Sequence, residues 1–139
     1  MIVVAIIGVM MTIASLNWQK YTANATLQSA ARDLVSDMNA MKQGAMSKFG
    51  TTYTITFNKG SNTYTKTGTT VETISLDSLG HGIQIYSLPA GASNYPLTFL
   101  ARGILDPASG TIELRNDRGS SARITFNTTG KTYVKFDKK

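Results

Sequence analysis

The sequence predicts an α+β fold, in which one long N-terminal α-helix precedes a C-terminal antiparallel β-sheet domain. Residues 1–48 contain no proline, and their apolar side chains lie at helical spacing. From Thr51 onward, short runs alternate apolar and polar residues and are separated by turn-forming clusters. A run of helix followed by a run of strands is the α+β pattern. The 139 residues leave room for one globular domain of modest size.

The first segment, residues 1–17, carries no charged side chain, and the first charge in the chain is Lys20. A 16-residue apolar helix is about 24 Å long, whereas a bilayer core is about 30 Å thick. The basic stretch and cleavage site of a signal peptide are absent. We therefore expect a membrane-inserting helix whose first residues are missing from this sequence. The residues expected to insert and to bundle with other helices are Met1, Ile2, Val3, Val4, Ile6, Ile7, Val9, Met10, Ile13 and Leu16.

The second helical segment, residues 18–48, is apolar on one side only. Its apolar residues recur at gaps of three and four positions, which is the spacing of an amphipathic helix. Such a stripe must lie on an apolar surface, so we expect it to dock on the sheet region, residues 51–136, within one globular domain, residues 18–139. With the first segment it forms a continuous helix of about 70 Å. The stripe consists of Leu27, Ala31, Leu34, Met38, Met41 and Ala45.

The remainder of the chain is rich in threonine and other β-branched residues, in runs of strand length. Proline and glycine predict loops at residues 88–96 and 103–110. We expect the strands to form an antiparallel sheet, because tight turns separate neighbouring runs. The expected strands are residues 53–57, 63–66, 69–76, 83–86, 97–101, 111–115, 122–127 and 132–136.

The sequence holds few residues that support catalysis. The only histidine, His81, lies between two glycines in a predicted loop, and the chain has no cysteine. Asp106 and Asp117 fall in separate predicted loops without the spacing of a calcium site. Gly80–Gly82 lacks the third glycine of a nucleotide-binding turn. We therefore expect no enzyme activity, no catalytic residue, no metal site, no cofactor and no small-molecule substrate.

Positive charge gathers at the C-terminal end. The chain has a net charge of +6, and residues 115–139 hold seven Lys or Arg against two Asp. Such a segment is either the solvated face of a sheet or a surface for an anionic partner, namely lipid, nucleic acid or an acidic protein.

The first eight residues, MIVVAIIG, resemble the second half of the N-terminal motif of type IV pilin-like proteins, approximately G-F-T-L-I-E-L-[ML]-I-V-[VI]-[AI]-I-[IL]-[GA]. The prepilin peptidase site and the glutamate of that motif belong to the half that is missing, and the glutamate would lie two residues before Met1. Roughly six further mature residues would lengthen the apolar helix to about 33 Å, which is enough to span a bilayer.

Two later segments indicate which group of pilin-like proteins the chain resembles. Residues 31–45 are similar to the helix of the GspH/FimT group, and residues 110–134 are similar to its C-terminal pattern of two strands and a Thr-Gly-Lys turn. Phe99 and Gly103 fit the element that precedes them. The resemblance implies a pilin-like fold and a minor pilin or minor pseudopilin of a type IV pilus or type II secretion system.

The same resemblance implies where the chain acts and with which partners. It implies a single-pass protein of the bacterial inner membrane, with its C-terminal domain in the periplasm before it enters a filament. Its partners would be other pilin-like subunits through helix bundling, the inner-membrane assembly platform, and membrane lipid before assembly. We expect the loops at Gly80–Pro96 and Asn116–Ser121 to face partners, because loops on a rigid scaffold often carry binding.

Three alternatives stay open. The chain could be a major filament subunit, or a simple membrane-anchored periplasmic domain. It could also bind DNA, since some members of the group do so through a C-terminal Gly-Arg-x-Arg. The matching stretch here is Gly130-Lys131-Thr132-Tyr133, in which tyrosine replaces the second arginine. The candidate DNA or partner contacts are Arg115, Arg118, Arg123, Lys131, Tyr133 and Lys135.

Overall fold

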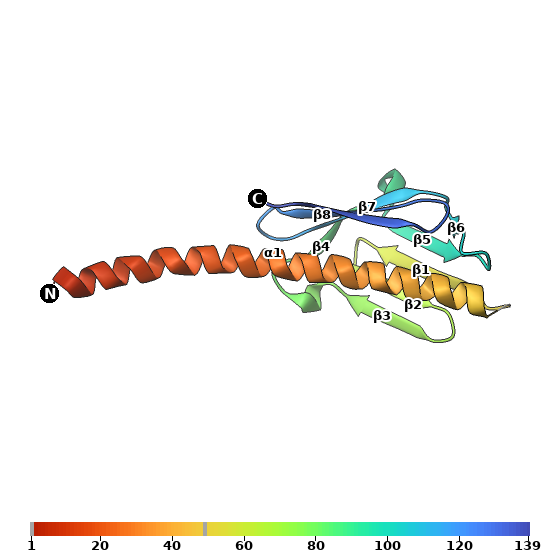
Figure 1. Cartoon of the computed structure of the whole chain (residues 1–139), viewed down its shortest axis with the longest axis horizontal. Helices are drawn as coiled ribbons and strands as arrows, with labels where there is room; N and C mark the ends of the chain where they lie inside the picture. The colour runs from red at the N-terminus through yellow and green to blue at the C-terminus, as the bar shows by residue number, and fades with distance from the viewer. Residues whose placement is uncertain (1, 49) are drawn as a thin grey trace.

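The chain folds as one long helix followed by antiparallel β-sheets, which confirms the predicted α+β class (Figure 1). The computed structural model describes the backbone of residues 2–48 and 50–139, and the side chains of residues 18–48 and 50–139. Within these residues the helix is α1 (Ile2–Ser47), and two 3-10 turns are η1 (Asp77–Leu79) and η2 (Pro89–Gly91). The strands are β1 (Tyr53–Asn58), β2 (Thr63–Thr67), β3 (Val71–Ser75), β4 (Gln84–Ser87), β5 (Asn94–Phe99), β6 (Leu105–Asp106), β7 (Gly110–Arg115), β8 (Ser121–Phe126) and β9 (Thr132–Asp137).

The helix α1 is continuous because no proline interrupts it, and its C-terminal half is rich in alanine, leucine, methionine and glutamine, which favour helix. It ends near Gly50, whose φ of 88° belongs to the left-handed region that glycine adopts at low cost. Its N-terminal half extends away from the sheets, and its C-terminal half lies across them (Figure 1). One helix therefore forms both the protruding rod and part of the domain.

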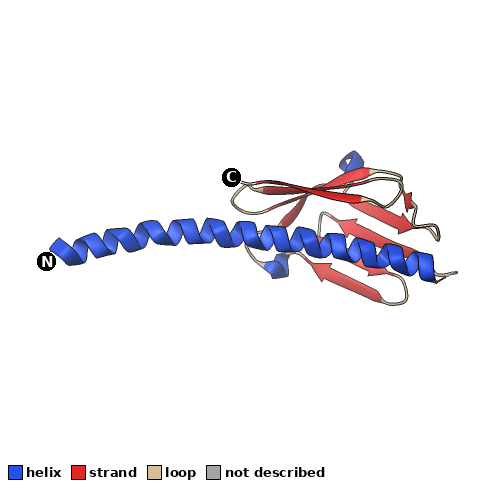
Figure 2. Cartoon of the chain, in the orientation of Figure 1, coloured by secondary structure: helices blue, strands red, loops and turns tan. Residues whose placement is uncertain are grey.

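The strands form two sheets rather than the single sheet expected. One is five-stranded, in the order β3-β2-β1-β5-β6, and the other is four-stranded, in the order β4-β7-β8-β9. The chain leaves the first sheet after β3 through η1 and through Gly80 and Gly82, whose φ values are 79° and 57°. It returns for β5 and β6 after η2, as Figure 2 shows. Alternation of residues within strands does not reveal which sheet a strand joins, which is why the sequence suggested one sheet.

Two predicted loops are wrong in part. Residues 88–96 contain η2 and the first residues of β5, and residues 103–110 contain β6 and the first residue of β7. Pro96 lies inside β5, opposite Thr56 of β1. The short β6 pairs only with Thr98 and Phe99, so no strand of the described residues flanks the outer edge of β5 at Pro96. A strand edge without a neighbour is where a sheet tolerates a proline.

The apolar stripe of α1 packs on both sheets. The helix contacts β1 and β5 of one sheet and β7, β8 and β9 of the other. Two alanines that the stripe prediction omitted, Ala23 and Ala30, are also buried, and small side chains let the helix approach the strands closely. The predicted stripe residues are all buried, namely Leu27, Ala31, Leu34, Met38, Met41 and Ala45.

Asn62, in the turn between β1 and β2, ties the two sheets together. Its side-chain NH₂ donates to the carbonyl oxygen of Ile83 at 2.7 Å and to a carboxylate oxygen of Asp77. Its side-chain oxygen accepts the backbone N–H of Ile85 in β4 at 2.8 Å. Asn62 is 9% exposed and has a φ of 53°, which asparagine tolerates better than most residues. A polar side chain thus takes the place of a neighbouring strand at the edge of β4.

A charged cluster fastens α1 to β2. Asp37 accepts a hydrogen bond from the Tyr64 hydroxyl at 2.8 Å and pairs with the Lys66 ammonium at 3.0 Å, and Lys66 also pairs with Glu72 at 2.9 Å. Burial, followed by the bond to Asp37, raises the pKa of Tyr64 above its usual range. Burial lowers the pKa of Lys66, but its bonds to Glu72 and Asp37 outweigh that effect and raise it.

Candidate interaction surfaces

The N-terminal half of α1 is the most prominent surface of the fold, because it projects beyond the sheets (Figure 1). Its backbone is helical from Ile2. The membrane and filament residues predicted between Met1 and Leu16 lie outside the side chains that the structure describes. Among the residues that the structure does describe, no helix combines the length and the apolar character needed to cross a membrane.

An exposed aromatic pair marks the place where α1 leaves the domain. Trp18 and Tyr21 are 70% and 71% exposed, and their ring centroids lie 6.5 Å apart. Two exposed aromatic rings side by side on one helix face form a small apolar patch, and such patches are candidate interaction surfaces. The pair was not predicted from the sequence, although its position just after the charge-free segment and its spacing of three residues could have revealed it.

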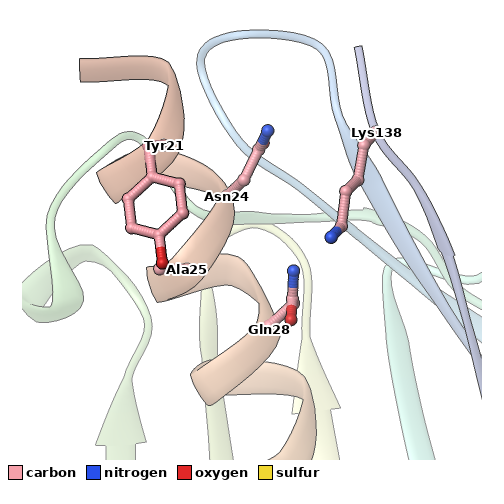
Figure 3. A pocket seen from close by; sticks show the side chains of 5 residues that line it. All are labelled: Tyr21, Asn24, Ala25, Gln28 and Lys138. Carbon is pink, nitrogen blue, oxygen red and sulfur yellow. The ribbon is translucent and has the colours of Figure 1, made fainter. Parts of the chain in front are cut away.

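A groove of about 240 Å³ adjoins the aromatic pair (Figure 3). It is lined by Tyr21, Asn24, Ala25 and Gln28 of α1 and by Lys138, which follows β9. Asn24, Ala25 and Gln28 follow Tyr21 by three, four and seven positions, so all four residues share one helical face. In Figure 3 the Lys138 side chain reaches toward the helix, near the amides of Asn24 and Gln28. The groove therefore combines one cation with amide hydrogen-bond donors.

The turn between β7 and β8 docks against the same part of α1. The Asn116 amide donates to the Asn24 side chain at 3.1 Å, and the Arg118 guanidinium donates to the Gln19 side-chain oxygen at 2.8 Å. Arg118 also lies 3.8 Å from Asp117. We call this region the helix-exit surface and define it by Trp18, Lys20, Tyr21, Asn24, Gln28, Arg118 and Lys138.

The predicted basic residues do not gather in one patch. Arg118 belongs to the helix-exit surface, whereas Lys131 lies in the turn at the other end of β8, beside the Tyr133 ring at 5.7 Å. A six-residue strand such as β8 spans roughly 20 Å, so these two cations are far apart. A DNA strand would have to follow the whole length of β8 and β9 to contact both.

Between these ends, acidic neighbours offset part of the charge. Arg123 lies opposite Lys135 on β9 and 3.4 Å from Glu113 on β7. Arg115 stacks on the Tyr86 ring, with its guanidinium carbon 3.7 Å from the centroid, and lies 3.9 Å from Glu113. The exposed candidates on the outer face of this sheet are therefore Arg123, Tyr133 and Lys135.

The two segments expected to be partner-facing loops differ from that expectation. Gly80–Pro96 contains β4, η2 and the start of β5, so it is not one loop. In Asn116–Ser121, the side chains of Asn116 and Ser120 are almost fully buried, at 2% and 1% exposure. This turn fastens the sheet to α1, and only its central residues reach solvent.

No cluster of metal-ligating side chains is found in the described part of the chain. The carbonyl oxygen of His81 accepts a hydrogen bond from the backbone N–H of Asp117 at 3.1 Å, and the φ of 54° at His81 marks a tight turn. Comparison of the chain with protein-family models, curated proteins and solved structures finds no match.

Proposed function

We propose that this chain is a non-enzymatic subunit of a pilin-like filament, a minor pilin or pseudopilin of the GspH/FimT kind, which assembles through the N-terminal half of α1. The observation that carries the proposal is the uninterrupted helix. It runs from a charge-free segment that projects beyond the domain into a buried stripe that packs on both sheets.

Physical chemistry explains why this arrangement suits a filament. A helix that is apolar all round must be surrounded by lipid or by other apolar helices. When such helices leave a bilayer they can bundle in a filament core, and the sheets attached to each helix then lie outside the core. The resemblance of residues 1–8 to the pilin motif supports the same conclusion.

Site-specific crosslinking in cells tests this proposal. The full precursor would carry single cysteines at positions from Val3 to Ile13, since the sequence has no cysteine of its own. Thr70→Cys, in the exposed turn between β2 and β3, is the matched control. We expect adducts to other pilin-like subunits from the helix positions and none from the control. Stable membrane protein without such adducts would refute filament assembly and leave a simple anchored domain.

DNA binding is a second candidate function, favoured by the exposed Arg123, Tyr133 and Lys135 on neighbouring strands β8 and β9. Lysine and arginine neutralise phosphates, and an exposed ring can stack on a base. We expect the affinity for single-stranded DNA to fall steeply with salt, and replacing Arg123 and Lys135 together to reduce the slope of log affinity against log salt by about 1.4. Binding that is independent of salt would refute this candidate.

A further inference from the structure

The helix-exit surface combines features that suit the boundary of a lipid bilayer. The aromatic pair Trp18 and Tyr21 is exposed directly after the charge-free segment. Tryptophan and tyrosine concentrate at the level of lipid headgroups, because their rings are apolar and their N–H or O–H group stays hydrated. Such a pair would therefore lie at the depth where an inserted apolar helix emerges into water.

Charge at the helix-exit surface is mainly positive. Lys20 lies between the two aromatic residues in the sequence, and Lys138 lines the groove next to Tyr21. Within the described residues, neither lysine takes part in an ion pair, whereas Arg118 is 3.8 Å from Asp117. Lysines at a bilayer surface attract anionic lipid headgroups.

The groove itself has the donors that a phosphate group requires. Lys138 supplies an ammonium, and Asn24 and Gln28 supply amide N–H groups, while the Tyr21 ring lines the groove with its hydroxyl beside Ala25 (Figure 3). Its volume of about 240 Å³ and its open mouth leave room for a headgroup phosphate but bury no long apolar ligand. The apolar part of a lipid would instead follow the exposed rings of Trp18 and Tyr21 down the protruding helix.

We propose that the helix-exit surface seats the domain on the membrane before assembly by holding the phosphate of an anionic phospholipid between Lys138 and α1. This inference rests on the proposed function only in that the protruding half of α1 is inserted in a bilayer. It adds a specific contact between the domain and the lipid surface. The C-terminal end of β9 would thus set how deeply and in which orientation the domain sits.

Trp18 is the only tryptophan, so its fluorescence reports directly on lipid near this surface. The full chain would be reconstituted at low protein-to-lipid ratio in phosphatidylcholine vesicles with about 30 mol % phosphatidylglycerol, comparable to the anionic surfaces that attract basic residues. Bromine atoms would be placed near the glycerol end of the acyl chains, first on one lipid and then on the other. The ratio of quenching gives the local enrichment of the anionic lipid beside Trp18.

We expect the ratio of anionic to zwitterionic lipid beside Trp18 to be about five times the ratio in the bulk bilayer, since one well-placed basic residue contributes on that order at an anionic surface. Lys138→Gln should abolish most of this enrichment, and Lys138→Arg should retain it. Lys131→Gln removes an equal charge at the far end of β8 and should leave the enrichment unchanged. Circular dichroism would verify that each variant is folded.

The contrary outcomes are separable. Quenching by both lipids without any enrichment, unaffected by Lys138→Gln, would overturn the headgroup contact while leaving insertion intact. Absence of quenching by either lipid would mean that the helix is not inserted, which overturns the proposed function as well. Enrichment that inorganic phosphate removes, but chloride of equal ionic strength does not, would assign the groove to a soluble anion. Quenching that varies with protein-to-lipid ratio rather than lipid composition would mean that a second copy covers the aromatic pair.

Discussion

Replacing Asn62 tests the idea that one side chain joins the two sheets. In Asn62→Gly the amide disappears, and the carbonyl of Ile83 and the N–H of Ile85 lose their partners. Glycine also adopts the φ of 53° without strain, so the backbone itself tolerates this substitution. The measured effect then reports the lost hydrogen bonds.

The magnitude follows from the two backbone groups left without partners. An unsatisfied buried donor or acceptor costs about 1–3 kcal/mol, so the expected loss in the free energy of unfolding is about 2–6 kcal/mol. Asn62→Ala should lose about 1 kcal/mol more, because a β-carbon is disfavoured in the left-handed region. Asn58→Ala is the matched control, since Asn58 accepts hydrogen bonds from Gly60 and Ser61 in the exposed part of the same turn. We expect it to lose less than about 1 kcal/mol.

Urea unfolding followed by circular dichroism would give these free energies, and hydrogen exchange would follow the Ile85 amide. Asn62→Gly should accelerate exchange at that amide as well as lower the midpoint. A variant within about 0.5 kcal/mol of the parent, with unchanged protection at Ile85, would refute the reasoning.

Three further predictions concern the packing of α1. Gly44→Ala should destabilise the folded protein by about 1–2 kcal/mol despite the better helix propensity of alanine, because the new β-carbon would lie 2.6 Å from the Tyr53 ring. Thermal unfolding would measure this loss, and a stabilised variant would contradict it. Leu34→Ala should cost about 2–5 kcal/mol, since Leu34 is only 1% exposed; a urea midpoint within error of the parent would contradict the docking of α1. Tyr64 has a raised pKa in the folded state, so its contribution to stability is full below the unfolded pKa of about 10 and is lost at higher pH. Tyr64→Phe, which removes the bond to Asp37, should flatten that alkaline decline in urea midpoint; an unchanged slope would show that other groups cause it.

The sequence was sufficient for features with a local signal. The stripe from Leu27 to Ala45 needs only helical spacing, and the turns at Asn116 and Gly130 need only their own residues. The assignment of strands to two sheets has no local signal. The strand β5 pairs with β1, although β4, which lies between them in the sequence, belongs to the other sheet. Pro96 wrongly suggested a loop for a related reason. A proline fits within β5 only because the neighbouring strand β6 is too short to pair with it, and the length of β6 is not evident near Pro96 in the sequence.

The candidate interaction surface likewise has one feature that is evident in the sequence and others that depend on the fold. The charge-free segment is evident in the sequence, but the groove beside Tyr21 exists only because Lys138, just after β9 and more than one hundred residues later in the chain, lies next to α1. Likewise, the separation of Arg118 from Lys131 follows from their positions at opposite ends of β8. Net charge left open whether the basic segment is a solvated sheet face or a surface for an anionic partner, and it could not say where on the surface each cation would lie.

The absence of a break in α1 fixes the angular phase between the rod and the domain. A helix turns by about 100° and rises by about 1.5 Å with each residue. Inserting one residue near Asn17 would therefore swing both sheets by about 100° around the axis of the rod while advancing them only slightly along it. A single deletion would swing them the opposite way. The number of residues between the two halves of α1 therefore sets the direction, around the axis of the rod, in which the sheets face a neighbouring molecule.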